Sequence, residues 1–434
     1  MSLTLIGLSG IVALLLIIFF LRIPVGFAMA MVGFAGFSIV VSPQAALGML
    51  SDEIWEVFSS YGLTVIPMFI LMGQISFHAG VNKRLYNAAY VWMGKIRGGM
   101  AMATILSCTG FAAICGSNTA TAATMGTVAL PEMKKYGYNP LLSASSVAVG
   151  ATLGVLIPPS VVLIVIGLQT GQAIGVLFWA ALIPGFLLCL FFIAVIFIAC
   201  WKNPQLGPSG VKTSFKEKLR SLKGTIEIVI LFVLIMIGLI KGFFTPTQAG
   251  AVGSFISLLI GVLGRNLSWK KFYLALTDTL RVSAMIMAII LGAVIFGRFL
   301  AVTRLPFELA NIVGEMALPS FLVIILIGLV YILGGAIMDA LALLIITIPI
   351  FFPVAASMGY DPVWFAVFIT VVTTLGAVTP PVGINTYIVA SMGHGVSLSD
   401  VFKGVMLFVP CFILLLALLI IFPGMATYLP GLFY

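Results

Sequence analysis

Apolar runs of membrane-crossing length follow one another along the whole chain, and short segments between them hold most of the charged residues. A helix needs about 20 apolar residues to cross the roughly 30 Å hydrocarbon core of a bilayer, and these runs have that length. In the first half, crossings are expected near 4–21, 24–42, 61–80, 141–168 and 176–200. Because the strands of a membrane barrel alternate over short segments, the pattern predicts an all-α integral membrane protein with about ten transmembrane helices.

The apolar segment 98–135 differs from the crossings because basic residues flank both of its ends. Lys95 and Arg97 precede it, and Lys134 and Lys135 close it. Lysine and arginine are enriched on the cytoplasmic side, so this segment should enter and leave the membrane on that side as a helical hairpin. Five crossings and one hairpin leave an odd number of crossings, which inverts the orientation of the half that follows.

The chain repeats itself at a shift of 222 residues (246 − 24), which pairs Pro24 with Pro246 and GYNP at 137–140 with GYDP at 359–362. The same shift pairs TLGVLIPPS at 152–160 with TLGAVTPPV at 374–382. One shift along most of each half indicates a duplication. The prediction is two inverted-topology repeats, 1–200 and 225–434, joined by a linker at 201–224, with a second hairpin at 320–356 that opens to the opposite side.

The basic residues of the linker predict the side of the membrane on which it lies. It holds six Lys or Arg against one Glu, which predicts a cytoplasmic location and puts both termini on the other side. The whole chain has 21 Lys and Arg against 12 Asp and Glu, but it is 62% hydrophobic and only 8% charged. Since the basic residues lie mostly between the apolar runs, we expect the lipid bilayer as a partner and no nucleic acid.

Paired prolines interrupt the expected broken helices 141–168 and 362–388 at matching places. A proline cannot donate to the carbonyl four residues earlier, so the first pair frees the carbonyls of Gly154 and Val155, and the second pair those of Gly376 and Ala377. An unpaired carbonyl costs several kcal/mol in hydrocarbon, and a buried cation would satisfy it. Proline and glycine are also common in ordinary membrane helices, but discontinuous helices at matching positions of inverted halves are typical of a transport site.

Polar residues gather at the expected tip of the first hairpin, in CGSNTATAAT at 115–124. Ser117, Asn118 and Thr119 offer neutral oxygen atoms, which suit an alkali cation. Asp339 stands at the equivalent position of the second hairpin and is the only carboxylate deep in an apolar run. An ionisable residue within the membrane is functional by default, although an aspartate at a hairpin tip also serves as a helix N-cap.

Arg298 lies in the outer part of its expected crossing. Its guanidinium group has the planar geometry that binds a carboxylate through two hydrogen bonds. The alternative is an arginine that extends along the helix to the membrane surface.

Other classes of protein fit the sequence less well. It contains no glycine loop ending in Gly-Lys-Ser or Gly-Lys-Thr and no His-Glu metal motif, so we do not expect an enzyme. A sodium/proton antiporter shares inverted repeats and broken helices, but proton exchange needs buried titratable groups and the chain offers almost none apart from Asp339. A stand-alone sodium/anion symporter is the other alternative.

Four long segments resemble one family over essentially the whole chain: GSNTATAATMGTVALPEMKKYGY, GATLGVLIPPS, GGAIMDALALLIITIPIFFP and GYDPVWFAVFITVVTTLGAVTPPVGINTY. They are similar to the large membrane subunit of tripartite ATP-independent periplasmic (TRAP) transporters. The resemblance implies sodium-driven import of an organic acid, such as sialic acid or a C4-dicarboxylate, by an elevator-like movement of the hairpin-bearing domain. It also implies the bacterial inner membrane, a small four-helix membrane subunit and a periplasmic substrate-binding protein.

The resemblance also implies ligands for Na⁺ as the coupling ion. One sodium site would lie between the first hairpin tip and the first break, at Ser117, Asn118, Thr119, Gly154, Pro158 and Ser160. The second would lie at Gly335, Met338, Asp339, Gly376, Thr379, Pro380 and Gly383. The substrate would bind between them, at Ser117, Asn118, Ser160, Arg298 and Asp339. The first tip departs from the family, which often has serines around this glycine, and its run of Ser117, Asn118 and Thr119 is similar to the tip of the related divalent-anion sodium symporters.

Overall fold

The computed structural model describes residues 2–21, 23–210, 213–222, 224–315, 319–392 and 396–433, and these residues form helices and no strand. The first half contains α1 (Leu3–Leu16), the π-helical turn η1 (Ile17–Leu21), α2 (Val25–Val40), α3 (Pro43–Ser59), the 3₁₀ turn η2 (Tyr61–Thr64), α4 (Val65–His78), α5 (Val81–Met93), α6 (Gly99–Cys115), α7 (Asn118–Lys135), α8 (Pro140–Leu156), α9 (Val161–Thr170) and α10 (Ile174–Lys202).

The linker contains α11 (Phe215–Leu222). The second half follows with α12 (Ile226–Ile240), α13 (Pro246–Leu263), α14 (Trp269–Val302), α15 (Leu305–Glu315), α16 (Ser320–Gly335), α17 (Ala340–Ser357), α18 (Pro362–Gly376), α19 (Ile384–Ser391), α20 (Leu398–Val405), α21 (Val409–Ile421) and α22 (Gly424–Phe433).

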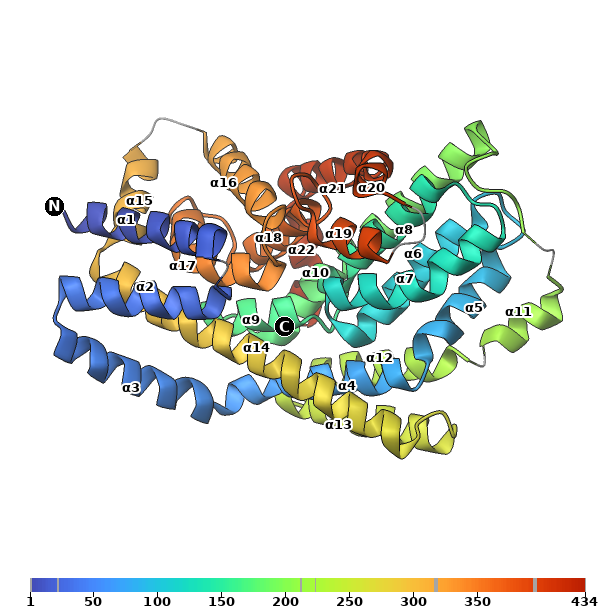
Figure 1. Cartoon of the computed structure of the whole chain (residues 1–434), viewed down its shortest axis with the longest axis horizontal. Coiled ribbons are helices and arrows are strands. Elements are labelled where there is room, and N and C mark those ends of the chain that lie inside the picture. The colour runs from blue at the N-terminus through green and yellow to red at the C-terminus, as the bar shows by residue number, and fades with distance from the viewer. Residues whose placement is uncertain are drawn as a thin grey trace.

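The two hairpins and the two broken helices that the sequence predicts correspond to four pairs of helices in the structure. The first hairpin is α6 and α7, and the second is α16 and α17. The first broken helix is α8 and α9, and the second is α18 and α19. In Figure 1 the two hairpins enter from opposite ends of the long axis, α6 and α7 from one end and α16 and α17 from the other.

The repeated GYNP and GYDP motifs explain how each broken helix begins. Gly137 and Gly359 adopt positive φ angles of 71° and 81°, which end the preceding hairpin helix at low steric cost. The side chain of Asn139 then accepts the backbone N–H of Leu141 at 2.9 Å, and Asp361 caps α18 by accepting the N–H of Trp364 at 2.9 Å. The proline that follows each cap occupies the first turn of the helix, where its missing N–H is not needed.

Helices of each half pack against helices of the other half, and equivalent helices do so in equivalent pairs. By the 222-residue shift α2 corresponds to α13, and α4 to the last part of α14. In space α2 packs on α14, while α13 packs on α4. Likewise α9 packs on α17 and α18, and its counterpart α19 packs on α7 and α8. Corresponding helices of the two halves therefore make corresponding contacts with the other half, as expected for an inverted repeat.

Glycines allow the closest of these approaches. A Cβ atom built on Gly26 of α2 would lie 2.6 Å from the carbonyl oxygen of Ala288 in α14. One built on Gly33 would lie 2.7 Å from the backbone of Phe296. Small residues at such crossings bring helix backbones together where the hydrophobic effect between helices is weak. The pair α2 and α14 thus forms a tightly packed frame.

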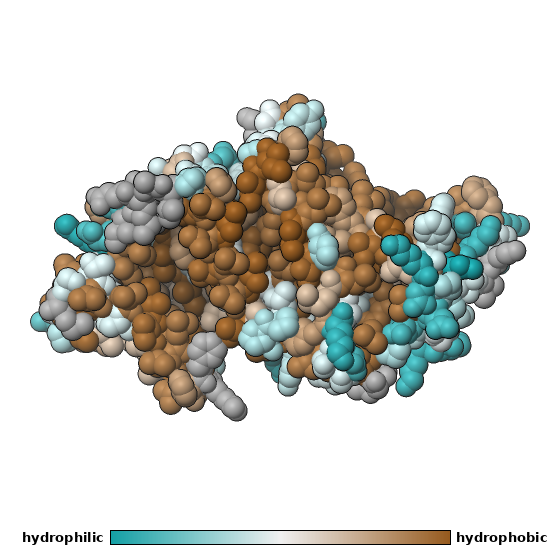
Figure 2. All heavy atoms as spheres, turned by 90° about the horizontal axis from the view of Figure 1, so that it is seen from above, coloured by the Kyte–Doolittle hydropathy of each residue, from teal (hydrophilic) through white to brown (hydrophobic). Residues whose placement is uncertain are grey.

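The surface agrees with a membrane protein. In Figure 2 hydrophobic residues cover the middle of the molecule, and hydrophilic residues gather mainly at the end where Figure 1 shows α5 and α11. Within the described residues, six helices are long and apolar enough to cross a membrane, or up to eight if each bent pair is one span. The ten expected crossings fall on α1, α2, α4, α8–α9 and α10, and then on α12, α13, α14, α18–α19 and α20–α21. Of these, α1, α2 and α18 are shorter apolar helices, and the six long ones include α17 of the second hairpin.

Several helices lie outside the elements that the sequence predicted. These are the amphipathic helices α3, α5, α11 and α15 and the C-terminal helix α22. The first four are short of the continuous apolar length that marks a crossing, so a search for crossings passes over them. The helix α22 packs on α10, where the rings of Phe433 and Trp179 lie 4.8 Å apart.

Candidate functional site

Each hairpin tip places a capping residue at the start of its second helix. At the first tip Gly116 turns the chain with a φ of 62°, and the Ser117 hydroxyl then accepts the N–H of Ala120 at 3.4 Å. At the second tip the carboxylate of Asp339 accepts the N–H of Leu341 at 3.0 Å. Since helix N-termini carry partial positive charge, both tips direct a positive helix end and an oxygen-bearing side chain to the same region.

The first tip packs directly against the first break. The backbone N–H of Val161 donates to the carbonyl of Gly116 at 3.3 Å. A Cβ atom on Gly154 would lie 2.5 Å from the carbonyl oxygen of Ser117. The structure therefore brings together the two segments expected to hold the first sodium ion, with backbone against backbone.

The second tip packs against the second break in an equivalent way. The backbone N–H of Gly383 donates to the carbonyl of Ala336 at 2.8 Å. A Cβ atom on Gly335 would lie 2.7 Å from the carbonyl oxygen of Thr373, and one on Gly376 would lie 2.6 Å from that of Ile332. This pair of segments includes the predicted residues Gly335, Met338, Asp339, Gly376, Thr379, Pro380 and Gly383.

Most of the carbonyls that the prolines free find partners within the chain. The Ser160 hydroxyl donates to the carbonyl of Val155 at 2.6 Å. The carbonyl of Gly376 accepts the N–H of Thr379 at 2.9 Å, and that of Ala377 accepts the N–H of Asn385 at 3.1 Å. The freed carbonyls therefore do not by themselves require a cation, although each carbonyl oxygen has a second lone pair.

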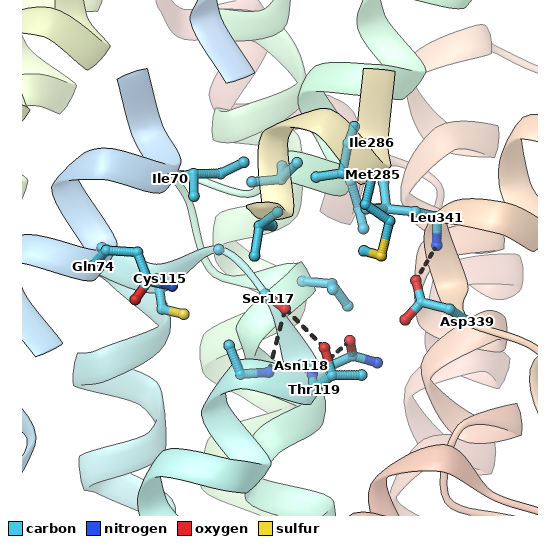
Figure 3. Close-up of a pocket in the computed structure, with 17 residues that line it drawn as sticks. Ile70, Gln74, Cys115, Ser117, Asn118, Thr119, Met285, Ile286, Asp339 and Leu341 are labelled. Atoms are coloured by element: carbon cyan, nitrogen blue, oxygen red, sulfur yellow. Dashed lines mark hydrogen bonds between the residues drawn. The ribbon is translucent and has the colours of Figure 1, made fainter. Parts of the chain in front are cut away.

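A cavity of about 320 Å³ lies between the two tips. Ser117, Asn118 and Thr119 of the first tip and Asp339 of the second line it. Figure 3 shows the first tip between Gln74 of α4 and Asp339. The Ser117 and Thr119 hydroxyls are 3.2 Å apart, and the Asn118 side chain accepts the N–H of Thr119 at 2.8 Å. This volume is within the range of small-molecule sites.

The described side chains that line this cavity include one carboxyl group and no basic group. Asp339 is acidic, and among the described lining residues none is lysine, arginine or histidine. The remaining polar groups are the hydroxyls and amides of Gln74, Ser117, Asn118 and Thr119. The cavity thus offers neutral and anionic oxygen ligands, which are the ligands that hard cations prefer.

The structure separates some predicted residues from this cavity. Gly154, Pro158 and Ser160 lie behind the first tip, and Gly335, Met338, Gly376, Thr379, Pro380 and Gly383 are not among the lining residues either. Ser160 is fully buried. These residues form the packing between each tip and its break, so any ion that they contact would lie within that packing.

Arg298 lies in a different place. Its Nε–H donates to the carboxylate of Glu53 on α3, and both residues line a second cavity of about 520 Å³ between α3, α9, α14 and α17. The side chain of Glu53 is only 5% exposed, while that of Arg298 is 56% exposed. Arg298 therefore joins the two halves through an ion pair, in addition to whatever it contacts in the cavity.

Sequence reasoning missed the part of the central cavity that comes from α4 and α14. Ile70, Gly73 and Gln74 line it from α4, and Val282, Met285 and Ile286 from α14. One signal was present, because Gln74 is a polar side chain in the middle of an expected crossing. The apolar residues of α14 gave no signal, since nothing distinguishes them from lipid-facing positions.

Two inverted halves, opposed hairpins and a central cavity lined by both hairpin tips beside discontinuous helices define a membrane transport protein built on inverted repeats. A family model described as the DctM component of tripartite ATP-independent periplasmic transporters matches residues 12–425. The chain belongs to this family and is a TRAP transporter large permease subunit.

Two curated relatives cover nearly the whole chain. The C4-dicarboxylate TRAP transporter large permease protein DctM of Pseudomonas aeruginosa is 32% identical over 91% of this chain and 90% of its own length. The sialic acid TRAP transporter large permease protein SiaM of Vibrio cholerae is 30% identical over 95% of this chain and 96% of its own length.

A solved structure shares the fold. The YdaH transporter of Alcanivorax borkumensis superposes with a TM-score of 0.66 over 89% of this chain and 90% of its own, at 13% sequence identity. The overall fold of this chain is therefore found in a protein of distant sequence.

Proposed function

We propose that this chain is the membrane permease of a sodium-coupled importer of an organic carboxylate, and that a periplasmic binding protein delivers the substrate. The names of the two relatives support a carboxylate, because one transports C4-dicarboxylates and the other sialic acid. The tripartite name of the family supports a small membrane subunit and a binding protein as partners. In this proposal the end of the molecule with α5 and α11 faces the cytoplasm of a bacterial inner membrane, since it carries the basic linker.

The charge of the central cavity carries the proposal. A carboxylate that enters it meets Asp339 and no basic side chain among the described lining residues. Burying the charge of a substrate carboxylate beside a second carboxyl group, without a cation, is strongly unfavourable. The N-termini of α7 and α17 supply partial positive charge, and bound sodium ions would supply the rest. Substrate binding would then require sodium, which is the basis of symport.

The two sodium ions are proposed to lie where each tip meets its break. The first would use oxygen atoms from Ser117, Asn118 and Thr119 and from the break at Gly154, Pro158 and Ser160. The second would use Asp339 with backbone oxygens near Gly335, Met338, Gly376, Thr379, Pro380 and Gly383. The substrate would bind in the cavity between them against Ser117, Asn118 and Asp339, with Ser160 close behind the tip and Arg298 on its path.

The walls of the cavity support an elevator-type movement. One wall comes from the hairpin tips and breaks, and the other from α4 and α14, which pack tightly with α13 and α2. If the hairpin-bearing group slides against this frame, the cavity passes from one membrane surface to the other. The apolar frame residues Ile70, Val282 and Ile286 would allow such sliding, because they make no directional contacts across the cavity.

The test is uptake into liposomes that contain this chain, its small subunit and its binding protein. A panel of labelled organic acids is offered with an inward sodium gradient, with a proton gradient alone, or with neither. The proposal predicts uptake of one carboxylate that requires both sodium and the binding protein. Uptake with a proton gradient alone would instead favour proton coupling, and uptake without the binding protein would favour a stand-alone symporter.

A further inference from the structure

The helix in the linker has an apolar face that no other described part of the chain covers. In α11, Phe215, Leu219 and Leu222 follow at i, i+4 and i+7, which places them on one face. Their exposed fractions are 75%, 59% and 39%. An eight-residue helix would not keep such a face in water without a partner.

The end of α5 holds this helix in place. The hydroxyl of Thr213 donates to the carbonyl of Val91 at 2.7 Å, and the N–H of Gly210 donates to the carbonyl of Gly94 at 2.7 Å. The ammonium group of Lys218 lies 5.6 Å from the centre of the Trp92 ring. These contacts attach both the linker and α11 to the end of α5.

The end of α5, the turn at 94–97 and α11 form one surface, which we call the α5–α11 surface. Its exposed apolar residues are Trp92, Ile96, Phe215, Leu219 and Leu222. Its basic residues are Lys95, Arg97, Lys216, Lys218 and Arg220. The acidic residue of α11, Glu217, accepts the N–H of Ser214 at 2.7 Å, so its charge is directed to the start of the helix. Figure 2 shows hydrophilic residues concentrated at this end of the molecule.

We propose that the α5–α11 surface binds anionic phospholipids at the membrane surface. Its apolar residues would enter the boundary between headgroups and acyl chains, and its basic residues would contact the anionic headgroups. Aromatic and apolar residues beside clustered lysine and arginine are typical of helices that lie in this boundary. Each basic residue near an anionic lipid surface adds to the attraction, and the surface combines five of them with an unpartnered apolar stripe.

The position of α11 in the chain agrees with this location. The apolar helix α12 begins at Ile226, four residues after the end of α11 at Leu222 (226 − 222). The axes of the two helices differ by 49°. Where α12 enters the bilayer, α11 therefore lies within a few residues of the membrane surface and turns away from the direction of the crossing.

A fluorescent label on a cysteine substituted for Leu219 tests the proposal. The native cysteines Cys108, Cys189, Cys200 and Cys411 are buried, and the unsubstituted chain measures any labelling of Cys115. The full chain is placed in nanodiscs of phosphatidylcholine with increasing phosphatidylglycerol. We expect a blue shift of the label and quenching by lipids with a nitroxide on the acyl chain, both increasing with phosphatidylglycerol. A label on Arg220→Cys should stay accessible to aqueous iodide.

Charge variants separate headgroup binding from apolar insertion. Adding Lys216→Gln and Arg220→Gln to the Leu219→Cys chain should require several-fold more phosphatidylglycerol for the same blue shift. The matched control removes two charges elsewhere, Lys270→Gln and Lys271→Gln, and should leave the curve unchanged. Equal quenching at all lipid compositions, or the same curve in both charge variants, would contradict binding to anionic phospholipids. Iodide access at residue 219 in every nanodisc, or burial only after the small subunit is added, would overturn membrane binding.

Discussion

The two hairpin tips begin their second helix in a similar way but differ in chemistry and in the length of the turn: residues 116–117 form the first turn and residues 336–339 the second. Both begin their second helix with a capped N-terminus beside a proline-interrupted helix, and both line one cavity. The first tip presents Ser117, Asn118 and Thr119, whereas the second presents Asp339, Ala340 and Leu341 at the equivalent positions. The difference teaches that the duplication preserved the cap of the second helix and its close packing against the break, while the carboxyl group and the polar groups of the cavity were divided unequally between the halves.

Removing the single charge of the second tip should have the largest effect. Asp339→Asn keeps a side-chain oxygen that can cap α17, but it takes away the one acidic group of the cavity. We expect the apparent sodium affinity of transport to fall by about 100-fold, which corresponds to about 3 kcal/mol for a buried charge that loses its partner. Sodium-dependent uptake measures this loss.

The control for that variant places the capping residue of the first tip, a serine, at the second tip. Asp339→Ser gives the second tip the residue that caps the first, so the unfolding temperature should stay close to that of the unchanged chain. If both Asp339→Asn and Asp339→Ser transport normally, Asp339 serves only as a helix cap.

Close packing should be equally important in both halves. Gly154→Ala and Gly376→Ala would each place a methyl group against a backbone carbonyl oxygen, at 2.5 Å and 2.6 Å. Overpacking of this kind costs about 1–3 kcal/mol. We expect both variants to unfold at lower temperature by similar amounts. Gly48→Ala is the matched control, because a Cβ atom there meets nothing within 4 Å; a large difference between the two breaks would show that the packing is not equivalent.

The ion pair between the halves should have an intermediate effect. Arg298→Gln leaves the carboxylate of Glu53 with 5% exposure and without its cation. Because the arginine side chain is more than half exposed, we expect a loss of about 1–2 kcal/mol, less than for a fully buried pair. Thermal unfolding of Arg298→Gln and of the double variant Arg298→Gln, Glu53→Gln measures it. The double variant should recover stability, and a double variant as unstable as the single one would contradict the ion pair as the cause.

The smallest effect is expected at Ser160. Ser160→Ala removes the hydroxyl that satisfies the carbonyl of Val155 in the first break. The equivalent residue in the second break is Val382, and there the carbonyls are satisfied by backbone N–H groups instead. A lost hydrogen bond to a buried carbonyl costs about 1 kcal/mol. Thermal unfolding should show this loss for Ser160→Ala, and none for Val382→Ala beyond the loss of its two methyl groups.

Much of the fold followed from the sequence because length and repetition constrain it strongly. The all-α membrane fold was predicted, and the expected hairpins and broken helices correspond to helix pairs in the structure, since apolar length and the shared shift identify them without side-chain detail. The amphipathic helices were not predicted, because their apolar residues cover one face only. The frame also differs between the halves in a way that the repeat did not indicate: α3, η2 and α4 are separate elements, but their counterpart α14 is one helix of 34 residues.

The site was predicted in part. Polar residues in an apolar run stand out, so Ser117, Asn118, Thr119 and Asp339 were identified, and the structure brings them into one cavity. The partner of Arg298 could not be predicted, because Glu53 is 245 residues away in the chain and no pattern links the two. The hydrogen-bond donors to the freed carbonyls could not be predicted either, because they depend on the geometry of each break.

The exchange of helices between the halves has a consequence for how the chain is made. α9 packs on α17 and α18, yet α17 begins 170 residues after α9 ends (340 − 170). During synthesis the first half therefore enters the bilayer with one face open, and it stays open until the second half has been translated and inserted. Contacts so distant in sequence form late. A ribosome that stalls between the halves would leave a membrane-inserted but incomplete product, which is a natural substrate for quality-control proteases.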